Sequence, residues 1–144
     1  MDHRQRRVLQ GNHEMDMKSL FKTAQLPDDF EYPQSFMKFI KDEPLPDLSP
    51  WFFLHKREGI SEAWFRTIQQ QYPSRKLIPF ARINNTDDVV CFDASLPSDD
   101  PLVHYVHTYA SPGWEDRGHV VNFDAWLKAA IADAVQFKAE GEEN

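Results

Sequence analysis

The side chains best suited to chemistry lie in the second half of the chain. The only cysteine, Cys91, falls within the stretch NNTDDVVCFD, which runs from Asn84 to Asp93 and carries three acids. A nucleophilic cysteine needs a neighbouring base and an electropositive setting. Val90 and Phe92 are apolar and Asp93 is acidic, so the sequence predicts a raised pKa for Cys91 and a role as a small, buried hydrophobic residue.

Two histidines have a spacing that can bind metal. His104 and His107 form an HxxH pair, which faces one way on a helix, but Val103, Tyr105 and Val106 around them favour a strand. Residues three apart on a strand point to opposite faces, so the pair does not predict a shared ion. The chain has no HExxH, CxxC, GxSxG, GxxxxGK[ST] or GxGxxG motif. We therefore expect no metal site and no cofactor.

The carboxylates leave one enzymatic alternative open. Asp87 and Asp88 are adjacent and face apart in a strand, and Asp93 lies roughly 20 Å from Asp87 along an extended chain. These acids do not form a preformed acid–base pair, so we expect the chain not to be an enzyme. A hydrolase would require at least two of the following side chains to converge in one cleft: Asp93, His104, His107 and His119.

The composition is that of one globular domain with an acidic surface. The 144 residues carry 16 basic and 23 acidic side chains, a net charge of −7, which argues against direct contact with nucleic acid and favours a basic partner. One cysteine cannot form an internal disulfide, and the basic N-terminus lacks the apolar run of a secretory signal. No apolar run is long enough to span a membrane, and we expect a cytoplasmic protein.

The hydrophobic pattern predicts a single α+β domain. Residues 1–16 are polar and unpatterned and are expected to be a flexible N-terminal segment, which leaves 17–144 for the folded domain. The predicted helices are 32–40, 60–72 and 122–135, and the predicted strands are 51–54, 76–83, 87–93 and 103–109. Strands grouped in sequence favour a mixed, mostly antiparallel sheet of about four to six strands, flanked by helices.

Helix ends and faces can also be predicted. Ser61 and Asn122 are candidate N-caps of the second and third helices. The C-terminal helix is long and amphipathic, and its apolar stripe is expected to lie on the sheet. The residues of that stripe are Phe123, Trp126, Leu127, Ala130, Ile131, Ala134 and Val135.

The turns and the central strand follow from residue type. NNTDD is predicted to be a hairpin turn whose polar side chains bond their own backbone, and Asp93 is expected to bond the loop that follows. In the strand that follows this turn, alternate apolar residues point to opposite faces, so the strand is expected to be covered on both faces or to lie at the centre of its sheet. Ser111 to Trp114 reads as a type II turn. Trp114 either folds back on the core or anchors a partner.

The ordered set of motifs resembles the SUKH superfamily. RKLIPFARINNTDDVVCFD, then LVHYVHTYASPGWEDRG, then NFDAWLKAAIADA, follow the family pattern, and the likeness covers about 51–134. The matching residues are Arg75, Pro79, Phe80, Ala81, Asp87, Asp88, Cys91, Phe92, Asp93, Ser111, Pro112, Gly113, Trp114, Phe123 and Trp126. Many members carry a Gly-Gly-Asp turn where this chain has Asn85-Thr86-Asp87, so the resemblance is to a branch with a glycine-free, acidic turn.

The resemblance implies an α+β binding domain. Bacterial members are regarded as immunity proteins that neutralise toxins, often nucleases, and fungal relatives are regulatory adaptors. We expect a non-enzymatic immunity protein that is a monomer or a weak dimer. Its acidic loops are expected to bind a basic toxin domain. The candidate contact residues are Asp87, Asp88, Asp99, Asp100, Trp114, Glu115 and Asp116. The alternatives are an adaptor that binds a host protein and the carboxylate–histidine hydrolase.

Overall fold

The computed structural model describes residues 26–27 and 29–143, so the predicted flexible segment 1–16 lies outside the described residues. The helical elements are α3 (Gln34–Lys41), the short 3-10 helix η1 (Leu54–Lys56), α4 (Ile60–Gln71) and α5 (Phe123–Glu143). The strands are β1 (Trp51–Phe53), β2 (Leu77–Ile83), β3 (Asp88–Asp93), β4 (Val103–His107) and β5 (Asp116–Val120). In this part of the chain, no helix is both long and apolar enough to cross a membrane.

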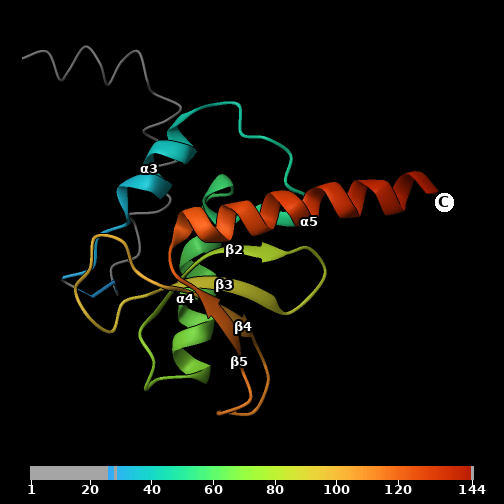
Figure 1. Ribbon diagram of the computed structural model, residues 1–144. Helices are drawn as coiled ribbons and strands as arrows, with labels where there is room; N and C mark the ends of the chain where they lie inside the picture. The colour runs from blue at the N-terminus through green and yellow to red at the C-terminus, as the bar shows by residue number, and fades with distance from the viewer. Residues whose placement is uncertain (1–25, 28, 144) are drawn as a thin grey trace, which may run out of the picture.

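The strands form one sheet in the order β1-β2-β3-β4-β5, and each pairs antiparallel with its neighbours (Figure 1). The α+β prediction with a mostly antiparallel sheet is confirmed. The sequence predicted the first four strands and missed β5, whose residues 116–119 are exposed and polar. Without apolar alternation, nothing marks such an edge strand in the sequence.

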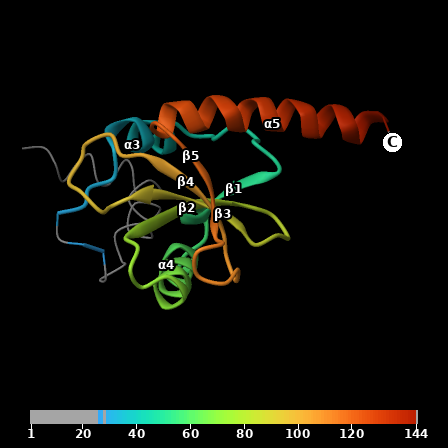
Figure 2. The same ribbon diagram turned by 60° about the horizontal axis from the view of Figure 1, so that its bottom comes forward.

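Helices cover both faces of the sheet. Figure 2 shows α3 and α5 on one face and α4 on the other. On β3, Val90 and Phe92 join the larger hydrophobic cluster, while Val89 and Cys91 join a smaller one with residues of α4. The prediction that alternate residues of this strand are buried on opposite faces is therefore confirmed.

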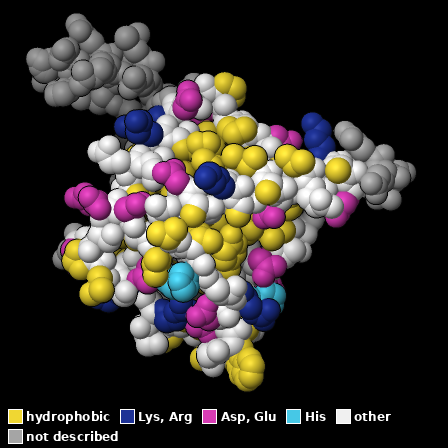
Figure 3. Space-filling view, viewed as in Figure 1, with side chains coloured by type: hydrophobic (Ala, Val, Ile, Leu, Met, Phe, Trp, Pro, Cys, Tyr) yellow, Lys and Arg dark blue, Asp and Glu magenta, His cyan; other side chains and the backbone are white. Residues whose placement is uncertain are grey.

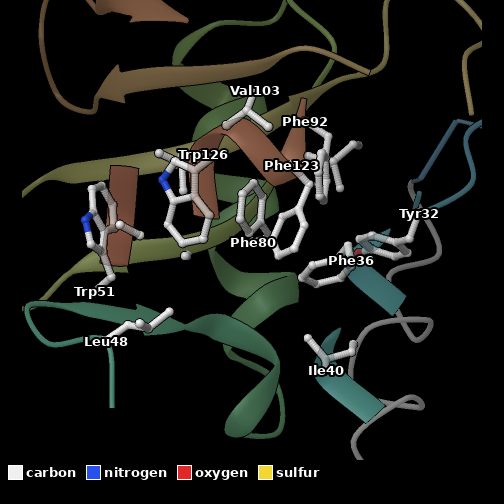
Figure 4. Packing of buried hydrophobic residues seen from close by; sticks show 14 of the residues in the cluster. Tyr32, Phe36, Ile40, Leu48, Trp51, Phe80, Phe92, Val103, Phe123 and Trp126 are labelled. Atoms are coloured by element: carbon white, nitrogen blue, oxygen red, sulfur yellow. The ribbon is translucent and has the colours of Figure 1, made fainter. Parts of the chain in front are cut away.

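The larger cluster is built mainly from aromatic rings (Figure 4). Phe80 and Phe92 stack with ring centroids 4.3 Å apart, and Trp126 of α5 meets Phe80 edge-on at 5.1 Å. Phe36 of α3 packs edge-on against both phenylalanines, at 5.5 and 5.3 Å. Each such pair adds about 0.5–1.5 kcal/mol beyond the burial of its area, so the rings fix how α3 and α5 sit on the sheet.

The helix ends partly follow the prediction. Asn122 caps α5, because its Oδ1 atom accepts the Ala125 N–H at 2.9 Å. The prediction that Ser61 caps α4 is wrong: the N-cap is Gly59, in a left-handed conformation with φ 84°, and Ser61 is buried in the first turn. A left-handed cap position favours glycine, which has no Cβ to clash.

The apolar stripe of α5 is only partly covered. Its first half packs on the sheet through Phe123, Trp126 and Ala130, which are fully buried. Farther along, the helix projects past the sheet (Figure 1), and Ile131 and Val135 are exposed. The prediction that the whole stripe lies on the sheet is therefore wrong for these two residues.

Candidate functional site

The β4–β5 loop, residues 108–115, is held in place by hydrogen bonds to two other segments. Both the N–H and the hydroxyl of Thr108 donate to the Asp87 carbonyl, at 2.9 and 2.8 Å. The Tyr109 N–H donates to the Gln71 side chain. The Tyr72 hydroxyl donates to the Ala110 carbonyl at 2.8 Å. The loop is thus tied to the β2–β3 turn and to the end of α4.

A partly buried ion pair completes this anchoring. Glu115 is only 5% exposed, and Arg75 donates Nη1–H to its Oε2 atom at 2.7 Å. The other carboxylate oxygen, Oε1, accepts the Gly113 N–H at 2.7 Å. Burial raises the pKa of Glu115, but the hydrogen bonds from Arg75 and the backbone outweigh it, so the pKa lies below its ordinary value of 4.5. The Glu115 carboxylate is therefore ionised and fixes the loop through contacts within the protein.

The anchored loop presents two aromatic side chains to solvent. Trp114 is 74% exposed and Tyr109 is 67% exposed. The turn before Trp114 is closed by its N–H donating to the Ser111 carbonyl at 2.9 Å, with Gly113 at φ 98°, as predicted for type II. Trp114 does not fold back on the core. At the lower end of Figure 3, where this loop lies in Figure 1, hydrophobic side chains protrude from the molecule.

Two exposed acids adjoin this loop. Asp87 is in the β2–β3 turn, whose chain is bonded to Thr108, and Asp116 begins β5. We call Asp87, Tyr109, Trp114 and Asp116 the tip surface. Sequence reasoning assigned Tyr109 to a strand and missed it as a surface residue. A positive φ of 67° at Tyr109 shows that the strand has already ended there.

The other predicted contact residues do not share this surface. Asp99 and Asp100 lie in the β3–β4 loop at the opposite end of the sheet, roughly 17 Å away by the rise of the strands. The Asp100 carboxylate accepts a hydrogen bond from Asn122 at 3.0 Å. Asp88 sits near the tip, but its Oδ1 atom lies 2.8 Å from Nδ1 of His107. Glu115 is buried, and both of its carboxylate oxygens accept hydrogen bonds within the protein, so we leave it out of the contact surface.

A polar cluster of Asp93, His104 and His119 lies on the face of the sheet that α4 covers. Nε2 of His104 lies 2.9 Å from Oδ2 of Asp93, and the His104 and His119 rings are 5.6 Å apart between centroids. His107 carries the predicted opposite orientation and contacts Asp88 instead. Three of the four side chains of the hydrolase alternative therefore come together, and the convergence on which that alternative depends is present.

The cluster borders an open pocket of about 280 Å³, lined by Ser74, Arg75, Lys76, Leu77, Asp93, Ser95 and His104. Burial raises the pKa of Asp93, but hydrogen bonds from Ser95 and His104 lower it more, so its pKa is below the ordinary value. Oδ1 of Asp93 accepts both the N–H and the hydroxyl of Ser95, at 2.8 and 2.5 Å, which confirms that Asp93 bonds the following loop.

Cys91 belongs neither to the tip surface nor to the polar cluster of Asp93, His104 and His119. It is fully buried, and burial raises the pKa of its thiol, with Arg75 opposing the shift only in part. This agrees with its predicted role as a core residue. Within 26–27 and 29–143, no three His, Cys, Asp or Glu side chains are placed to hold a metal ion. No protein-family model matches the chain, and comparisons with curated proteins and with solved structures also give no match.

Proposed function

We propose that this chain is a protein-binding domain without enzymatic activity, and that the tip surface makes the contact. The observation that carries the proposal is a pair of exposed aromatic rings, Tyr109 and Trp114, on a loop already fixed by the ion pair between Arg75 and Glu115. Tryptophan and tyrosine are enriched among the few residues that carry most of the binding energy of a protein interface. A loop ordered before binding loses little conformational entropy when a partner arrives.

More particularly, we propose an immunity protein of the SUKH type that neutralises a basic, nuclease-type toxin. The motif resemblance supports this assignment, and the charge balance is compatible with it. A chain with a net charge of −7 attracts a cationic toxin surface, and two of those charges, Asp87 and Asp116, adjoin the loop that carries the aromatic rings.

The test is protection of cells that express a toxin domain encoded beside the gene of this chain. The wild-type chain should restore growth, and the double variant Tyr109→Ala/Trp114→Ala should not, although it keeps the fold by circular dichroism. Reversing Asp87 and Asp116 to Lys should also abolish protection. The matched control reverses Asp99 and Asp100, at the other end of the sheet, and should protect normally. Protection lost only in the control variant would refute the tip surface, and no protection by the wild type would refute the immunity role.

An adaptor that binds a host protein would use the same surface. It differs in what it captures: the wild-type chain would retain a host protein that the Tyr109→Ala/Trp114→Ala variant releases, without protecting against any toxin. Loss of capture in this variant, with retention in the Asp99 and Asp100 control, would favour the adaptor. Capture that both variants retain equally would count against it.

The hydrolase is kept as a second candidate because Asp93 and His104 are in contact at the edge of a pocket. A histidine oriented by a carboxylate can act as a general base. This candidate predicts that the purified chain hydrolyses model ester or phosphodiester substrates and that His104→Gln removes the activity while His107→Gln retains it. Equal background rates for all three proteins would eliminate it.

A further inference from the structure

A groove of about 370 Å³ lies between the edge strand β1 and the first turns of α4. Phe52 of β1 lines it, as do Ile60 and Trp64 of α4 and Arg82 of β2, which is the cross-strand partner of Phe52. Neither Ile60 nor Trp64 is fully buried. About half of the Phe52 surface is exposed as well, so the groove offers apolar and aromatic surface to solvent.

The groove is basic although the chain is acidic overall. Lys56, Arg57 and Arg82 line it, and none of its lining residues is an acid. The pocket beside His104 and a third pocket under the end of α5 contain one carboxylate each, from Asp93 and Asp47. Against a net charge of −7, this groove is therefore a local site of positive charge.

Two of the three basic side chains, Arg82 and Lys56, are held by neighbouring groups. The third, Arg57, is available to bind a ligand. The Arg82 guanidinium lies over the Trp64 ring, 5.0 Å from its centroid, and donates Nη2–H to the Thr86 carbonyl at 2.8 Å. Lys56 pairs with Glu43 at 3.0 Å. Arg57 is exposed, and within the described residues no hydrogen bond or ion pair engages its side chain.

We propose that this groove binds an extended acidic segment of a partner protein, with one apolar side chain against Phe52 and Trp64 and a carboxylate on Arg57. β1 is an edge of the described sheet, so an extended main chain can lie alongside it. Arg and aromatic side chains together recognise a carboxylate beside an apolar group. A nucleic-acid strand is disfavoured, because it has no peptide N–H and C=O groups to pair with the edge of β1. None of the residues that line the groove belongs to the tip surface, and the proposal does not depend on the function of that surface.

The test uses a fluorescein-labelled decapeptide of glutamates with one central phenylalanine, and fluorescence anisotropy with the full chain. We expect binding that weakens with salt, and a loss of about fivefold or more in affinity for Arg57→Glu. The matched control is Lys128→Glu, which makes the same change of charge at an exposed position on α5 and should bind as the wild type does. Circular dichroism checks that both variants fold.

Two comparison probes and an NMR spectrum distinguish an acidic peptide from other ligands of the groove. The same peptide with lysine in place of glutamate should not bind, and a decamer of thymidine should bind more weakly than the acidic peptide. In a proton–nitrogen correlation spectrum, the indole signal of Trp64 should shift and that of Trp114 should not. The proposal is overturned by no binding of the acidic peptide, by equal losses in the two variants, by shifts at Trp114 alone, or by tighter binding of the oligonucleotide.

Discussion

The ion pair beneath the tip surface allows a quantitative prediction for the variant Glu115→Gln. Glutamine keeps one carbonyl oxygen for the Gly113 N–H but turns an amide group toward the Arg75 guanidinium, where two donors face each other. Losing a charge-assisted hydrogen bond costs about 1.5–3 kcal/mol. The Arg75 side chain is 24% exposed, so its guanidinium can turn toward water in the variant. We therefore expect a loss of about 2 kcal/mol in the free energy of unfolding, below the roughly 3–5 kcal/mol for a fully buried pair.

The pH dependence of this loss distinguishes the ion pair from simple packing. The pKa of Glu115 in the folded protein lies below the ordinary value of 4.5, so the unfolded chain takes up the proton first as the pH falls. The stabilisation by the ionised carboxylate is complete above about pH 4.5 and is lost as the pH falls through the folded-state pKa. The difference between wild type and variant should therefore shrink under acid conditions.

Urea unfolding followed by tryptophan fluorescence, at neutral pH and at several acid values, measures this difference. At neutral pH the variant should also melt about 6–8 °C lower than the wild type. The matched control Asp99→Asn removes an exposed carboxylate and should change stability by less than about 0.5 kcal/mol. A difference for Glu115→Gln that stays constant from neutral to acid pH would refute the assignment of the stabilisation to the ionised carboxylate.

Three further predictions follow from burial. Trp114→Ala should change the free energy of unfolding by less than about 0.5 kcal/mol in urea titrations, because its ring is exposed; a larger loss would mean that the ring supports the fold. The thiol of Cys91 should react with a disulfide reagent such as DTNB only after unfolding, and rapid reaction in the native state would contradict its burial. Ile131→Ser and Val135→Ser should be nearly neutral in thermal melts, whereas Trp126→Ala should cost about 3–5 kcal/mol; equal effects would contradict the overhang of α5.

Local sequence patterns predicted those elements whose burial follows the period of the secondary structure. The alternation from Val89 to Phe92 gave the two-faced strand correctly, because successive side chains of a strand always point to opposite faces. Asn122 and the start of α5 were also predicted, since capping depends on residues a few positions apart. Ile131 was misplaced because helical periodicity defines a face of the helix but not how far the sheet extends beneath it.

Contacts between distant residues could not be predicted in this way. Arg75 and Glu115 are 40 positions apart, and nothing in either neighbourhood indicates the other. Asp93 and His104 meet because β3 and β4 pair in a particular register, which the sequence did not specify. The split of the acidic loops between two ends of the sheet follows from the opposite directions of successive strands. These features arise from the tertiary arrangement, on which the candidate site depends more than the fold class does.

The position of the central strand β3 between the two hydrophobic clusters affects how the protein unfolds. Its residues alternate between the two hydrophobic clusters, with Val90 and Phe92 in one and Val89 and Cys91 in the other. Pulling this strand away from either cluster breaks its pairing with β2 and β4 and removes side chains from the other cluster at the same time. Fluorescence from the aromatic layer and release of the hidden thiol should therefore report one cooperative transition with a shared midpoint.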